Sequence, residues 1–222
     1  QGDSDEDRTA YGEVVLAAIG RVPNTDADWF RSSGLKLDER GYVTVDGYGR
    51  TNLDGVWALG DITPGHALAH RAFEQGITIA EKIAGADPKP VIDDTVPQVV
   101  FSFPEAASVG LTLDQAKARE DVVEPKETAY PMLSNARMLM SGEGGSMTVV
   151  SGAFANNPDM QVVLGVHIVS PIASDLIAEA EQLVGNRVPL ADAARLIHPH
   201  PTFSETLGEA LLKADGRPLH TR

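Results

Sequence analysis

The sequence predicts an α+β fold, and two observations in its second half carry that prediction. Residues 147–154 and 161–169 have the composition of strands, and Asn156-Asn157-Pro158-Asp159 between them is typical of a hairpin turn. Ser170-Pro171 then combines a helix N-cap with a first-turn proline, which predicts a helix to about Val184. Strands joined by a hairpin pair antiparallel, so we expect a layered α+β domain with helices on one side of an antiparallel sheet.

Four shorter elements complete this second half. Residues 96–101 form an apolar run that predicts a strand. Thr112 and Gln115 have the spacing of a capping box, which predicts a short helix to about Arg119. Two more helices are expected near the end of the chain, over residues 191–196 and 201–214.

The first half contains short apolar runs that end at glycine. Residues 13–19 predict a buried strand that stops at Gly20, and residues 56–59 predict another that stops at Gly60. Residues 41–46 alternate between polar and apolar side chains, as an edge or hairpin strand does. This pattern differs from that of the second half, so we expect a separate structural unit here.

A helix and a linker follow these strands. Apolar residues recur at near-helical spacing over residues 67–84, and Gly85 is a suitable stop. Prolines and aspartates then mark a linker, and they comprise Pro88, Pro90, Asp93 and Asp94. We therefore place a domain boundary near residue 94.

Composition excludes several classes of partner and site. The 222 residues, 42% of them hydrophobic, suit the packed core of one large or two small domains. A net charge of −14 argues against a nucleic-acid partner, and no apolar run is long enough to span a membrane. The chain has no cysteine, and its histidines are not spaced as a metal cluster, so we expect neither a disulfide nor a metal site within it.

The chain begins in an unusual way. Its first residue is Gln1, the segment to Arg8 is polar and acidic, and no signal-peptide pattern is visible. This opening is like the interior loop of a larger protein. We expect the chain to be a fragment.

Gly60 and Asp61 lie between a predicted strand and a predicted helix, where open α/β sheets bind ligands. Glycine allows a ligand to approach the backbone, and the carboxylate can accept hydrogen bonds from sugar-alcohol hydroxyls. The helix that begins near Ala67 would direct its first amides, with their partial positive charge, at the same ligand. The alternative is an ordinary turn with Asp61 as a turn residue. Gly20 also follows a predicted strand, and it could face a second nucleotide. The alternative is that Gly20 is only the end of a strand.

The segment from His198 to Glu205 carries the strongest chemical signal. His200 precedes a proline that begins or nearly begins a helix, and Glu205 lies one turn inside that helix. A carboxylate there can reach back to the imidazole, which is the arrangement of an acid–base pair. Alternatively, Thr202 and Glu205 form a capping box. His198 has no obvious partner and is expected to be structural. Arg137 either reaches a partner surface or has no role in chemistry.

Five ordered motifs resemble one family, the flavin-dependent pyridine nucleotide–disulfide oxidoreductases, and within it the enzymes that oxidise dihydrolipoyl groups. The resemblance covers about 190 residues of the C-terminal half of such proteins. It is carried by residues 18–24, 51–61, 67–72, 96–110 and 198–205. It implies three parts: a remnant of the nicotinamide-nucleotide domain (1–22), the end of the FAD-binding and central domain (23–94), and the interface domain (95–222).

The resemblance also implies roles for individual residues. Gly20 would lie against NAD, while Gly60, Asp61 and the backbone of Ala67, Leu68, Ala69 and His70 would contact FAD. His200 would take a proton from a dihydrolipoyl thiol and Glu205 would orient it. The thiolate would attack a disulfide in the partner subunit of a homodimer, and electrons would pass through FAD to NAD. The implied partner is the lipoyl domain of a 2-oxo acid dehydrogenase complex, in the cytoplasm.

Other members of the same family remain open as interpretations. Mercuric, mycothione and glutathione reductases share the fold, as do soluble transhydrogenases and quinone reductases. The flavin fingerprint and the redox-active cysteine pair of the family are missing from these 222 residues. We therefore expect the chain to be inactive alone, and a non-catalytic dimerisation module is the alternative that is not an enzyme.

Overall fold

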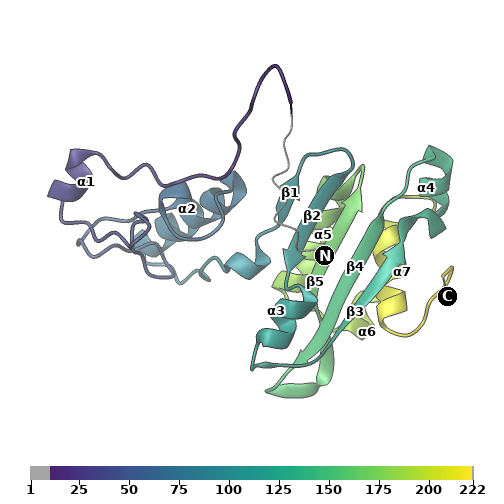
Figure 1. Ribbon diagram of the computed structural model, residues 1–222. Coiled ribbons are helices and arrows are strands. Elements are labelled where there is room, and N and C mark those ends of the chain that lie inside the picture. Colours follow the sequence, from purple (N-terminus) through teal and green to yellow (C-terminus); the bar gives the residue numbers. More distant parts are fainter. Residues whose placement is uncertain (1–10, 222) are drawn as a thin grey trace.

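The computed structural model describes residues 11–221, and its main feature is a five-stranded antiparallel sheet (Figure 1). The strand order is β1-β2-β5-β4-β3. The strands are β1 (Gln98–Val100), β2 (Glu105–Gly110), β3 (Val122–Pro131), β4 (Ser146–Phe154) and β5 (Asn157–Ser170). The β4–β5 hairpin pairs Val149 with Val166, so the predicted hairpin and the α+β prediction are confirmed.

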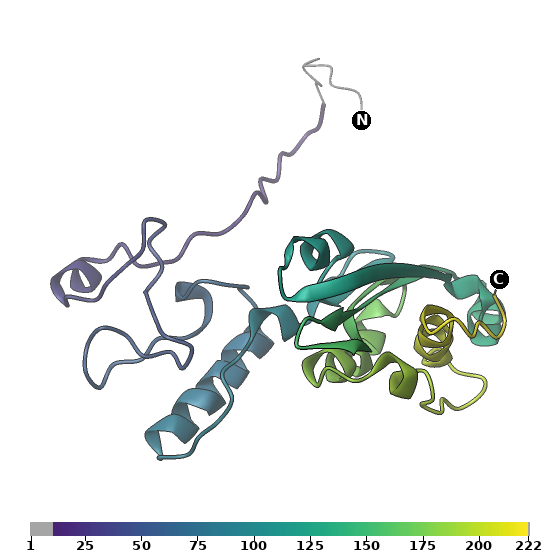
Figure 2. The same cartoon turned by 90° about the horizontal axis from the view of Figure 1, so that it is seen from below.

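Helices cover both faces of this sheet, to unequal extents, so the expectation of helices on one side alone is wrong (Figure 2). The larger core lies beneath α5 (Ala173–Gly185), α6 (Leu190–Ala193) and α7 (Glu205–Ala214), and it buries Tyr130, Val149 and Val166 of the sheet. The smaller core lies beneath α3 (Leu113–Ala118) and buries Val150 and Val162. Adjacent residues of one strand thus enter opposite cores, as the strand period of two requires.

The first half contains two helices of its own, α1 (Asp28–Ser32) and α2 (Ala69–Ile83). The observed α2 agrees with the helix expected over residues 67–84. Two short 3₁₀ turns flank it, η1 (Gly60–Ile62) before it and η2 (Asp93–Thr95) where the chain enters the sheet.

One of the three strand predictions for the first half is wrong, and the other two are reduced to bridges. Residues 13–19 form no strand, and their side chains are exposed, as Ile19 is at 98%. The segments 41–46 and 56–59 contribute only the isolated bridges Leu37–Val43 and Arg50–Trp57. A buried strand needs neighbouring strands and a covering layer, and the described residues supply neither to residues 13–19.

Two helix starts also differ from the predictions. The capping box of Thr112 and Gln115 is confirmed at α3. By contrast, Ser170 ends β5 instead of capping α5, whose Ser174 N–H donates to Glu105 Oε2 at 2.8 Å. Helix α7 begins at Glu205 rather than at residue 201. The N–H and the carbonyl of Thr202, which precedes the helix, bond instead to the side chains of Glu205 and Asn135. Between residues 11 and 221, none of the helices is both long and apolar enough to cross a membrane.

Candidate functional site

His200 and Glu205 form a hydrogen-bonded pair at the start of α7. His200 Nδ1 lies 2.8 Å from Glu205 Oε1, and the imidazole side chain is 69% exposed whereas the carboxylate is 18% exposed. A carboxylate can only accept, so Nδ1 carries a proton, and in the neutral ring Nε2 is an acceptor that has no partner among the described residues. The pair therefore presents a basic nitrogen to the exterior from a fixed ring orientation.

The second carboxylate oxygen of Glu205 makes a different bond. The Thr202 N–H donates to Glu205 Oε2 at 2.7 Å, while the Thr202 hydroxyl donates to the Pro199 carbonyl at 2.6 Å. The Thr202 hydroxyl does not accept from the Glu205 N–H, so the capping box is incomplete. Ser204 is the N-cap residue of α7. The two alternatives for Glu205 are thus compatible: one oxygen holds the loop and the other holds the imidazole.

The surroundings of Glu205 favour its charged form. Burial opposes ionisation, but the Thr202 N–H and the His200 ring outweigh that effect and lower the pKa of Glu205. The positive charges that His200 and His198 can carry act in the same direction. The carboxylate is therefore ionised at neutral pH, as its role as an acceptor requires.

His198 has a partner that the sequence did not reveal. Its ring is 9% exposed, and Nε2 lies 2.8 Å from Glu179 Oε1 on α5. The ring lies directly against α7, because a Cβ added at Gly208 would be 2.5 Å from His198 Nδ1. The expectation that His198 lacks a partner is wrong, since the fold brings together residues nineteen positions apart.

We expect the Glu179–His198 pair to make stability depend on pH. The hydrogen bond to Glu179 raises the pKa of His198 above its ordinary value of 6.5, against the effect of burial. A raised pKa means that the stabilisation is complete below the unfolded-state pKa and is lost as the pH rises through the folded-state value. Glu179→Gln should therefore flatten the decline in unfolding free energy as the pH rises above the ordinary histidine pKa of 6.5. Denaturant unfolding measures this decline, and Glu181→Gln, on the same helix, should leave it unchanged.

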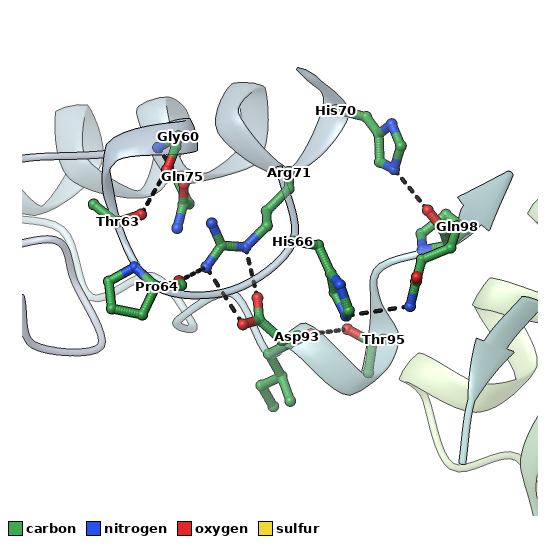
Figure 3. A network of polar contacts seen from close by, with 12 residues as sticks. Gly60, Thr63, Pro64, His66, His70, Arg71, Gln75, Asp93, Thr95 and Gln98 are labelled. Carbon is green, nitrogen blue, oxygen red and sulfur yellow. Dashed lines mark hydrogen bonds and ion pairs between the residues drawn. The ribbon is translucent and has the colours of Figure 1, made fainter. Parts of the chain in front are cut away.

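Gly60 and Asp61 lie beside helix α2, at the turn η1 (Figure 3). The Gly60 N–H donates to Gln75 Oε1 at 2.9 Å, and the Thr63 hydroxyl donates to the Gly60 carbonyl at 2.8 Å. Asp61 points outward with 56% of its side chain exposed, and the nearest cation, Arg21, is 4.0 Å away. The turn is fixed from inside while its carboxylate remains accessible.

The first turn of α2 is open to the exterior. Ala67, Ala69 and His70 are exposed and Leu68 is half-buried, and no side chain caps the helix. His70 Nε2 lies 2.7 Å from the carbonyl of Pro97, which ties the helix start to the entry of β1. The Leu68 N–H donates to the His66 carbonyl at 3.0 Å, so within the described residues the amides of Ala69 and His70 are those left to an acceptor outside the chain.

Gly20 is not brought to this turn by any contact of its own. It has a φ of 134° and lies in an exposed segment with no atom within 4 Å of a Cβ built on it. Only its neighbour Arg21 approaches Asp61. The structure joins Gly60, Asp61 and the start of α2, but it leaves Gly20 apart.

A buried arginine that sequence reasoning missed supports this region (Figure 3). Arg71 is 5% exposed, its Nε donates to Asp93 Oδ1 at 2.6 Å, and its Nη2 donates to the Pro64 carbonyl at 2.6 Å. Arg71 shares the inner face of α2 with Thr78 and Ile79, so a charged residue at a core-facing position was the available signal. It links the loop before α2 to the linker before β1.

Tyr130 and Glu209 form a second polar group beneath α7. The Tyr130 hydroxyl is fully buried and, within residues 11–221, has no hydrogen-bond partner. Burial, with Glu209 and Glu205 nearby, raises the pKa of Tyr130, so the phenol stays neutral. Glu209 pairs with His220 of the C-terminal segment. No set of three metal-ligating side chains converges in the part of the chain that the structure describes.

Comparison with known proteins places this geometry in context. A family model described as the pyridine nucleotide-disulphide oxidoreductase dimerisation domain matches residues 96–211. A second, described as pyridine nucleotide-disulphide oxidoreductase, matches residues 3–76. The two matched ranges include the turn at Gly60 and the His200–Glu205 pair. The match to the dimerisation domain ends within α7.

Individual relatives agree with the family models. A dihydrolipoyl dehydrogenase of Cupriavidus necator is 41% identical over 96% of this chain and 44% of that protein. One from Geobacillus stearothermophilus is 39% identical over 97% of this chain and 44% of that protein. The crystal structure of LpdA from Mycobacterium tuberculosis superposes with a TM-score of 0.78 at 31% identity, covering 89% of this chain and 42% of that one. The chain thus spans less than half the length of these relatives.

Proposed function

Because the chain belongs to the pyridine nucleotide-disulphide oxidoreductase family, we propose that it is the C-terminal part of a dihydrolipoamide dehydrogenase. The whole protein would oxidise dihydrolipoyl groups through a disulfide and FAD, with NAD as the final acceptor. One observation carries the proposal: an exposed imidazole is held by an ionised carboxylate at 2.8 Å, with its second nitrogen free. The names of relatives that are 35–41% identical support the choice of dihydrolipoyl groups as substrate.

His200 acts as the acid–base residue in this proposal. A dihydrolipoyl thiol must lose its proton before its sulfur can attack a disulfide, because the thiolate is the nucleophile. Nε2 of His200 accepts that proton, and the resulting imidazolium is stabilised by Glu205 through Nδ1. The net oxidation releases one proton for each NAD reduced, so the imidazolium must pass its proton to solvent before the next turnover, and the 69% exposure of the side chain permits this.

The residues at the start of α2 fit the flavin that the family implies. The outward carboxylate of Asp61 can accept hydrogen bonds from the ribityl hydroxyls, while Gly60 is buried against Ala72 of α2 and holds the turn in place. The uncapped first amides of α2, those of Ala69 and His70, favour negative charge on the ring. FAD, when bound, would accept two electrons from the reduced disulfide and pass them to NAD as a hydride. Gly20 is assigned to NAD by its position in the motif alone.

We infer that residues 95–222 form a homodimer interface and that each dyad serves the disulfide of the partner subunit. The printed description of the matching family model supports dimerisation. Large apolar side chains are exposed in the segment 133–140 and just before His198. They are Leu133 at 51%, Leu139 at 63%, Met140 at 68% and Ile197 at 96%. We also propose a division of the chain at residues 22 and 94, a lipoyl domain as the partner, and a cytoplasmic location.

Steady-state kinetics of the native protein that carries this chain test the proposal. The purified protein should contain a flavin. It should form NADH when dihydrolipoamide and NAD are supplied. Turnover of glutathione disulfide, mercuric ion or a quinone in place of dihydrolipoamide would contradict the substrate assignment. A flavin-free protein that dimerises without activity would instead favour the non-catalytic module.

A further inference from the structure

Asn135 is a buried side chain that connects helix α4 (Ala136–Ser141) to the loop of the dyad. It is 5% exposed and caps α4, because its Oδ1 accepts a hydrogen bond from the Met138 N–H at 3.1 Å. Its Nδ2 donates to the carbonyl of Thr202 at 3.2 Å, across 67 residues of sequence. One amide thus fixes the start of a helix and a distant loop at once.

Thr202 passes this constraint to the dyad. Its carbonyl accepts from Asn135, and its N–H donates to Glu205 Oε2 at 2.7 Å. The other oxygen of Glu205 accepts from His200 Nδ1 at 2.8 Å. The hydrogen bonds therefore form a continuous series from Asn135 through Thr202 and Glu205 to His200.

Helix α4 touches the same loop at a second point. The guanidinium of Arg137 lies 5.3 Å from the ring centroid of Phe203, in a cation–π contact. The backbone of Asn135 is itself held, since its N–H donates to the Met132 carbonyl at 3.0 Å. The loop between Pro199 and Ser204 is thus held by the segment around α4 as well as by its own connection to α7.

We propose that Asn135 is a positioning residue for the His200–Glu205 dyad, which it orients through the backbone of Thr202 without touching substrate. The inference rests on the proposed function, because it assigns Asn135 to the acid–base step of that reaction. An imidazole displaced by about 1 Å can lose up to about 100-fold in rate, so a distant hydrogen bond is sufficient to matter.

Asn135→Asp in the native protein is the most specific variant. The new carboxylate keeps the shape and can still accept from Met138, so α4 stays capped. It cannot donate to Thr202, and its charge repels that carbonyl. We expect the kcat for dihydrolipoamide to fall about 10- to 100-fold. Electron transfer from NADH to an artificial acceptor, which does not use the dyad, should stay unchanged.

Asn135→Ser keeps a capping oxygen and removes the donor without adding charge, so it should also lower kcat.

A double variant distinguishes positioning from general damage. In a His200→Gln background, Asn135→Asp should cause no further loss, because its effect acts through His200. Asn186→Asp is the matched control: its Nδ2 donates to the Gln182 carbonyl at 2.8 Å on α5, and its loss should leave kcat unchanged.

Each outcome bears on one proposal. A wild-type protein without dihydrolipoamide activity would overturn the proposed function. Full kcat in both Asn135 variants, with His200→Gln still impaired, would overturn only the positioning role. Equal losses in the dihydrolipoamide and NADH reactions, or a further loss in the double variant, would also overturn it.

Discussion

His200→Gln should lower dihydrolipoamide turnover by about 10²- to 10⁴-fold, the usual effect of removing a general acid–base residue. Glutamine fills a similar volume and can donate to Glu205, but it cannot take a proton from a thiol. The ring it replaces is 69% exposed, so the fold should be unaffected. Stopped-flow reduction of the flavin by dihydrolipoamide measures the affected step, whereas reduction by NADH should proceed at the wild-type rate.

His220→Gln is the matched control for this variant. His220 also pairs with a glutamate of α7, Glu209, and is also largely exposed, but it has no assigned part in the reaction. Its substitution should leave turnover within about twofold of wild type. Unchanged turnover in His200→Gln would remove that residue from the mechanism.

Gly110→Ala should cause a large loss of stability although it adds only one methyl group. Gly110 has a φ of +80°, and an added Cβ would lie 2.2 Å from the Leu164 carbonyl oxygen and 2.6 Å from Gly165 Cα, both backbone atoms of β5. The side chain cannot be accommodated unless β2 and β5 separate. We expect an overpacking cost of about 1–3 kcal/mol in unfolding free energy, in addition to the backbone cost of a positive φ.

Gly85→Ala separates those two costs. Gly85 has nearly the same φ, +85°, but no atom lies within 4 Å of the place that a Cβ would take, so only the backbone cost applies. Denaturant unfolding of both variants measures the difference between them. Equal losses would show that β2 and β5 tolerate the extra methyl group, contrary to the close approach of their backbones.

Local signals in the sequence predicted several features that depend on neighbours in the chain, although the cap expected at Ser170 was wrong. The β4–β5 hairpin and the capping box at Thr112 follow from turn and cap chemistry within a few residues. Glu205 and His200 are five positions apart, so their pairing was also accessible. The buried strand expected over residues 13–19 failed because its partners would have to come from elsewhere, and periodicity carries no information on that point.

The contacts that support the site lie beyond such local reasoning. Asn135 meets Thr202 across 67 residues, and Glu179 meets His198 across nineteen. Neither contact has a spacing that a motif would encode, because the sheet determines which segments become neighbours. Arg71 was closer to being predictable, since it is a charged residue on the inner face of an amphipathic helix.

Glu205 illustrates how two interpretations of one residue can both apply. A glutamate three residues after Thr202 suggested a helix cap, and the same glutamate five residues after His200 suggested an acid–base pair. Its two oxygens divide these tasks, so the bond that orders the loop also fixes the carboxylate that orients the imidazole. Local structure and chemistry therefore depend on the same side chain.

Mixed dimers test most directly whether the dyad of one subunit serves the disulfide of its partner. Full-length subunits with His200→Gln are combined with subunits whose redox-active cysteines are replaced by serine, and the heterodimer is isolated by two affinity tags. If the dyad acts across the interface, one of the two sites is intact, and the heterodimer should show about half of the wild-type turnover although each parent homodimer is inactive. An inactive heterodimer would mean that His200 serves the disulfide of its own subunit, and would contradict the proposal.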